Sequence, residues 1–137
     1  MKFFLDNNET PQILSVLAPV YRQHEFRTAV EEHLTDLLDI PLFQELSNRG
    51  FDAIITRDRN QLGDPAERGA LRSAGLHWIG HKEPNTEGIS IITSLTAGYL
   101  SAFPHILNEI SAATCPLSFR VQAIPRELKQ RVKINPI

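Results

Sequence analysis

Short apolar segments alternate along this sequence with longer segments of helical periodicity, and this alternation restricts the possible fold classes more than any other feature does. The apolar segment at 53–56 is continuous, which is typical of a parallel strand buried on both faces. A succession of strand, helix, strand and helix favours an α/β domain, with a mostly parallel central sheet between two layers of helices. Strands are expected at residues 2–5, 25–29, 53–56, 76–79 and 117–124, and helices are expected to begin at Pro11 (capped by Thr10), Asp39, Pro65, Ile91 and Pro125.

Length and composition agree with one such domain over residues 1–137. A chain of this length with 42% hydrophobic residues buries a core without disulfides or a structural metal. The one cysteine, Cys115, is expected to be an inert core thiol; it cannot form an internal disulfide, which fits the reducing cytoplasm. No apolar run approaches the roughly 18 residues of a membrane span, and the N-terminal segment has too few apolar residues for a signal peptide. We therefore expect a cytoplasmic protein with no membrane partner.

Three aspartates stand where an α/β fold places its ligands. Asp6 follows the first expected strand, Asp58 follows the strand at 53–56, and Asp39 begins the helix before that strand. Ligands of such folds bind beyond the carboxyl ends of the strands, near the point where the strand order reverses. Carboxylates gathered there repel one another and raise each other's pKa unless a cation neutralises them. Mg²⁺ or Mn²⁺ is the natural cation for oxygen ligands, and it promotes phosphodiester hydrolysis by activating water and stabilising charge.

Each of these positions also has a structural interpretation. Asp39 is placed to cap its helix, Asp58 is placed to cap a turn, and Asp64 before Pro65 has the pattern of a helix N-cap. The residues alone leave a metal site and a set of caps as alternatives. The joint placement of Asp6 and Asp58 after apolar strands makes the metal site about as well supported as the structural interpretation.

Three segments form a recognisable series: the opening segment 3–8 (FFLDNN), the helix that begins at Asp39 and the segment 54–60 (IITRDRN). In order and spacing they resemble the acidic segments of the small PIN-like domains of VapC-type toxins. The segment 64–71 (DPAERGAL) resembles the helix that follows them. The resemblance is close over residues 2–80 and extends to the remainder in outline.

The resemblance implies a three-layer PIN-like fold and a metal-dependent ribonuclease that is paired with an antitoxin protein. Carried over by position, Asp6, Asp39 and Asp58 would bind the metal ion and carry out catalysis. Family members often add a fourth acid near the third, where this chain has the weaker ligand Asn60, so a second metal ion stays open. The accessory residues are Asn8, which would orient an aspartate or a water molecule, Asn60 itself, and Asp64 or Glu67, which would supply the missing charge.

Basic residues beside the acids and near the C-terminus are candidates for RNA binding. Arg57 and Arg59 flank Asp58, where they would hold RNA phosphates or, alternatively, pair with the acids. Residues 119–137 hold five basic residues and one acidic residue, which leaves a net charge of −6 on the rest of the chain. Because an acidic cleft repels a polyanion, we expect this basic tail to contact RNA through Lys129, Arg131 and Lys133. A solvated tail, or one that binds an acidic antitoxin segment, is the alternative.

These observations together predict a Mg²⁺- or Mn²⁺-dependent endoribonuclease, the toxin of a toxin–antitoxin pair, with RNA and a cognate antitoxin as partners. A homodimer stays open. One alternative is a PIN-like binding module that has lost catalysis, which Asn60 favours. The other is a receiver-type phosphoacceptor domain, which would need a lysine after a late strand, and the sequence has none between Lys82 and Lys129.

Overall fold

In the described part of the chain, five parallel strands form one central sheet. The computed structural model describes residues 1–82, 88–122, 124 and 134–135. The strands pair in the order β2-β1-β3-β4-β5, and each pairing is parallel. This confirms the prediction of an α/β fold with a parallel sheet. The strands are β1 (Lys2–Leu5), β2 (Glu25–Thr28), β3 (Ala53–Ile55), β4 (His77–His81) and β5 (Ser118–Val121).

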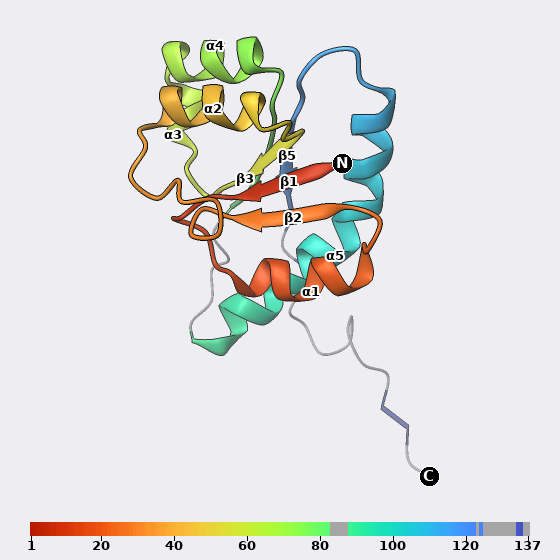
Figure 1. The fold of residues 1–137 in the computed structure, drawn as a ribbon. Helices are drawn as coiled ribbons and strands as arrows, with labels where there is room; N and C mark the ends of the chain where they lie inside the picture. Colours follow the sequence, from red (N-terminus) through yellow and green to blue (C-terminus); the bar gives the residue numbers. More distant parts are fainter. Residues whose placement is uncertain (83–87, 123, 125–133, 136–137) are drawn as a thin grey trace.

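Helices cover both faces of this sheet (Figure 1). On one face lie α2 (Asp39–Asn48), α3 (Asn60–Gly63) and α4 (Pro65–Ala74), and on the other lie α1 (Gln12–Val20) and α5 (Ile89–Ala112). The arrangement is the three-layer α/β/α fold expected from the sequence. The helix predicted at Pro125 and the tail residues Lys129, Arg131 and Lys133 lie outside the described residues.

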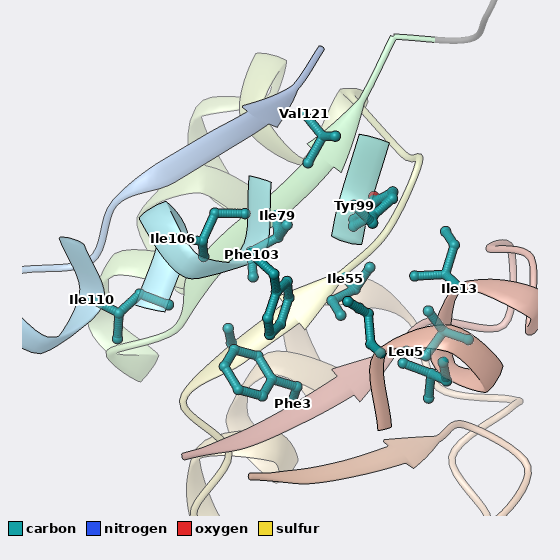
Figure 2. Packing of buried hydrophobic residues seen from close by; sticks show 13 residues of the cluster. Phe3, Leu5, Ile13, Ile55, Ile79, Tyr99, Phe103, Ile106, Ile110 and Val121 are labelled. Atoms are coloured by element: carbon teal, nitrogen blue, oxygen red, sulfur yellow. The ribbon is translucent and has the colours of Figure 1, made fainter. Parts of the chain in front are cut away.

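Alternate side chains of the central strands fill two separate cores. Phe3 of β1 and Ile55 of β3 point to the face of α1 and α5, where Figure 2 shows them near Phe103. Phe4, which follows Phe3, and Ile54, which precedes Ile55, point to the opposite face. Because these strands are buried on both faces, their sequence is a continuous apolar run. The second core contains Phe4, Ala29, Leu34, Leu42, Phe43, Leu46, Phe51, Ile54, Leu71, Leu76 and Trp78.

α4 begins and ends at the residues that the sequence indicates. Asp64 Oδ1 accepts the backbone N–H of Ala66 at 2.7 Å and that of Glu67 at 3.1 Å, so Asp64 is the N-cap. Gly75 follows the last turn with φ of 73°, a left-handed conformation that glycine adopts without strain. Since α4 follows the carboxyl end of β3, its first turn brings Glu67 to that edge of the sheet.

Two local predictions are wrong, and one short helix was missed. Thr10 does not cap α1, because the helix begins at Gln12 and the Thr10 hydroxyl donates to the Gln12 side chain instead. The four-residue α3 was not predicted, since so short a helix shows no periodicity. Cys115 is exposed, in the connection between α5 and β5, and is not a core thiol.

α5 is long and apolar enough to cross a membrane by length and composition, and no other helix in the described part of the chain is. The expectation that no segment reaches such a length is therefore wrong for α5. One face of α5 belongs to the core, because Tyr99, Phe103 and Ile106 are buried in the cluster that α5 forms with α1 and the sheet. Other apolar residues of α5, Ile89 and Ile92, are exposed.

Candidate functional site

The strand order reverses between β1 and β3. From β1 the chain continues to β2 on one side, whereas β3, β4 and β5 extend the sheet on the other. Asp6 directly follows β1, and its backbone N–H donates to the carbonyl of Ile55 in β3 at 2.9 Å. Thr56 directly follows β3. The two strand ends therefore lie side by side at the edge where α/β folds place ligands.

The hydroxyl of Thr56 connects the polar groups at this edge. It donates to Asp6 Oδ2 at 2.8 Å, and it accepts the backbone N–H of Asp58 at 3.1 Å. Asn8 Oδ1 lies 3.2 Å from the same hydroxyl. Thr56 is fully buried, so its hydroxyl depends on these protein partners rather than on bulk water. One side chain thus fixes the position of Asp6 relative to the segment that carries Asp58.

A second chain of hydrogen bonds holds Asp39. Gln61 of α3 donates its Nε2–H to Asp39 Oδ1 at 2.6 Å, and Gln61 Oε1 accepts the indole N–H of Trp78 at 3.3 Å. Asp39 is the first residue of α2, and the N-cap position belongs to Leu38. The interpretation of Asp39 as a helix cap is therefore wrong, and its carboxylate faces Gln61 instead.

Asp58 does make the turn-capping hydrogen bond that its alternative interpretation predicts. Its Oδ1 accepts the backbone N–H of Asn60 at 2.8 Å, which shapes the entry into α3. This contact engages one oxygen, and a carboxylate has lone pairs on both. A structural role for Asp58 and a ligand role are therefore compatible.

Glu67 brings a fourth carboxylate to the site. Its Oε2 is shielded from solvent and has no hydrogen-bond partner among the described residues. Burial raises the pKa of Glu67, and the charges of Asp39, Asp64 and Asp58 raise it further. A buried carboxylate oxygen beside other acids is stabilised by a cation or an ordered water.

Burial and neighbouring negative charges both affect the pKa of the Asp6 carboxyl group. Burial raises its pKa above the usual 3.8, and the charges of Asp39 and Asp58 raise it further. The Thr56 hydroxyl and the backbone N–H of Asn7, which donates to Asp6 Oδ1 at 2.7 Å, act in the opposite direction. The three aspartates come from separate segments, and the fold brings them near enough for their charges to interact.

The side chains present have the chemistry of a hard-cation site. No group of three or more His, Cys, Asp or Glu side chains within residues 1–82 and the later described segments is arranged to hold a metal ion as it stands. Mg²⁺, however, keeps several waters and takes only one or two carboxylates directly. Negative charge that needs neutralising, oxygen donors throughout and the buried Glu67 Oε2 all suit such an ion. The residues therefore fit Mg²⁺ or Mn²⁺ chemically.

The other predicted residues surround this site. Arg57, Arg59 and Asn60 are exposed beside Asp58, and Asn8 is exposed beside Thr56. Asp64 is occupied as the N-cap of α4.

Thr56 and Gln61 were not singled out by the sequence analysis. A polar residue that ends a continuous apolar strand is a signal that would have indicated Thr56. No comparable signal exists for Gln61, because its helix was not predicted.

Comparison with known families gives one result. The sequence model of the family described as PIN like domain matches residues 1–83, a stretch that contains β1 to β4 and the acids described above. Comparison with curated proteins and with solved structures found no match.

Proposed function

Because the chain belongs to the PIN-like domain family, a family of nuclease-type domains, we propose that it is an endoribonuclease that hydrolyses RNA phosphodiester bonds with Mg²⁺ or Mn²⁺. The acids proposed to hold the cation, directly or through its bound waters, and to carry out catalysis are Asp6, Asp39 and Asp58, with Glu67 as the fourth acid. The observation that carries the proposal is the gathering of these acids where the strand order reverses, with the pKa of Asp6 raised by burial and by the other two aspartates.

The side chains of the site are prepared for this chemistry before any ion binds. A divalent cation would supply charge that stabilises a phosphodiester under attack and would make water more acidic. Thr56 and the backbone of Asn7 each hold one oxygen of Asp6, and Gln61 holds one oxygen of Asp39. Carboxylates restrained in this way lose little conformational freedom when they take up a ligand.

The proposal includes a path for the RNA strand. Arg57 and Arg59, exposed on either side of Asp58, support phosphate binding next to the acids. In this proposal Lys129, Arg131 and Lys133 of the C-terminal segment add positive charge, which offsets the repulsion between an acidic site and a polyanion.

The resemblance to VapC-type toxins extends the proposal to a cytoplasmic toxin that is neutralised by an antitoxin. Expression of the chain alone should then arrest growth, and coexpression of the protein encoded beside it should restore growth. Unchanged growth with active protein would leave a ribonuclease without a toxin role.

Thermal unfolding in the presence and absence of Mg²⁺ or Mn²⁺ tests the metal site. A cation that binds only the folded protein adds about 2.7 kcal/mol to the free energy of unfolding at 100 times its Kd. We expect a rise in Tm for the wild type, and we expect Asp6→Asn and Asp58→Asn to lose most of it.

Asp52→Asn is the matched control. Asp52 precedes β3, at the opposite edge of the sheet, and Asn keeps an oxygen to accept the Lys2 backbone N–H that Asp52 binds at 2.6 Å. The rise in Tm that the cation causes in Asp52→Asn should equal the rise in the wild type. Equal shifts in all variants would place the ion elsewhere, and no shift in the wild type would favour a PIN-like binding module without catalysis.

A further inference from the structure

A buried chain of hydrogen bonds joins the core of the domain to the acidic site. We propose that Gln61 is a positioning residue that orients Asp39 for cation binding, and that Trp78 orients Gln61. This inference rests on the proposed function and adds to it a device that holds one ligand in place without touching the cation.

The chemistry of the partners determines the orientation of the Gln61 amide. The indole N–H of Trp78 can only donate a hydrogen bond, so it must face Gln61 Oε1, which lies 3.3 Å away. The amide nitrogen then faces Asp39 Oδ1 at 2.6 Å, a short distance that suits a charge-assisted hydrogen bond to a carboxylate. Reversing the amide would break both contacts. Gln61 is fully buried, so neither contact can be replaced by bulk water.

Trp78 is itself held firmly. It lies in β4, which pairs with β3 and β5, and its side chain is 2% exposed. Its ring packs over Gly80, where an added Cβ would overlap the ring and would lie 2.7 Å from the carbonyl oxygen of Thr56. The anchor of the chain is therefore the sheet itself.

The placement of Asp39 indicates that Gln61 positions this carboxylate and does more than fill space in the core. Asp39 is half-buried in the first turn of α2, where a carboxylate can be hydrated without a protein donor. Gln61 engages its Oδ1 and restricts rotation of the side chain, which leaves Oδ2 for a further ligand. The hydrogen bonds from Trp78 through Gln61 to Asp39 thus connect β4, α3 and α2, and they hold the negative charge of Asp39 in one position.

The test combines calorimetry with NMR, because Trp78 is the one tryptophan of the sequence. Gln61→Met keeps the length of the side chain and removes both hydrogen bonds. Loss of an outer-shell partner weakens metal binding by about 10- to 100-fold, and we expect this increase in the Kd for Mg²⁺. In the wild type, the indole N–H signal of Trp78 should shift during an Mg²⁺ titration with a midpoint at the calorimetric Kd. In Gln61→Met that signal should not respond to Mg²⁺.

Two further variants separate the effect of the hydrogen bonds from a general effect of substitution. Gln44→Met places the same substitution on an exposed position of α2 and should bind Mg²⁺ like the wild type. Trp78→Phe removes the indole donor together with part of the buried ring, keeps Gln61 in place, and should weaken binding less than Gln61→Met does. A Gln61→Met protein with lower Tm but unchanged Kd would overturn the inference and leave the proposed function intact. An indole signal that ignores saturating Mg²⁺ in the wild type would overturn it too, even if Gln61→Met fails to fold. A wild type that binds neither Mg²⁺ nor Mn²⁺ would overturn both proposals.

Discussion

Among single residues, Thr56 holds two parts of the proposed metal site together. Its buried hydroxyl contacts both the Asp6 carboxylate and the backbone of Asp58. Thr56→Val keeps the shape of the side chain but leaves the Asp58 N–H without its acceptor. We expect the Kd for Mg²⁺ to rise about tenfold, as measured by calorimetry. Thr56→Ser retains the hydroxyl and should stay close to the wild type. Equal affinities for the Val and Ser variants would show that the hydroxyl does not orient Asp6.

The raised pKa of Asp6 predicts how the stability of the metal-free protein depends on pH. Burial and the neighbouring aspartates make the folded state bind the Asp6 proton more tightly than the unfolded state does. The free energy of unfolding therefore falls as the pH rises from about the usual 3.8 through the pKa of the folded state. Asp6→Asn removes this contribution.

Denaturant unfolding without metal, measured from acidic to neutral pH, checks this prediction. The variant should be more stable than the wild type at neutral pH, and the difference should shrink as the pH falls. Identical pH profiles for the two proteins would mean that Asp6 experiences no net repulsion in the folded state.

At the scale of elements, two glycines should respond in opposite directions to the same change. A Cβ at Gly80 in β4 would overlap the Trp78 ring, whereas Gly69 in α4 has nothing within 4 Å of a Cβ. Overpacking makes Gly80→Ala destabilising by about 1 to 3 kcal/mol. Gly69→Ala should stabilise by about 0.5 to 1 kcal/mol, because alanine is the better helix former. Denaturant unfolding measures both. A neutral Gly80→Ala would show that Trp78 can move aside, which would also weaken the case for a rigid anchor.

Elements with strong local signals were predictable from the sequence. Asp64, Pro65 and Gly75 define the ends of α4, and the continuous apolar run of β3 indicates a strand buried on both faces. α3 was not predictable, since its four residues are held by tertiary contacts rather than by periodicity. The prediction that Thr10 caps α1 failed because the Thr10 hydroxyl binds the Gln12 side chain instead. That contact depends on the conformation of the folded loop.

At the scale of the whole molecule, the topology determines which residues meet. The sequence predicted that Asp6 and Asp58 follow parallel strands and lie at the same edge of the sheet, and the pairing of β1 with β3, which was not predicted, makes those strands neighbours. It did not predict the chain from Trp78 to Asp39, because that chain depends on side-chain directions from three elements. The family match over residues 1–83 coincides with the part of the fold that builds this edge.

Cleavage of RNA shows whether the carboxylates at this edge act with a divalent cation as a nuclease site. Purified wild type, Asp58→Asn and the Asp52→Asn control would be incubated with single-stranded RNA, with Mn²⁺ or with a chelator, and the fragments resolved on a gel. We expect cleavage by the wild type and by Asp52→Asn only when the cation is present, and a loss of at least about 100-fold in rate for Asp58→Asn, equivalent to roughly 2.7 kcal/mol of transition-state stabilisation. Cleavage that persists in the chelator, or that is equal in Asp58→Asn and the wild type, would contradict a metal-dependent nuclease site at this edge.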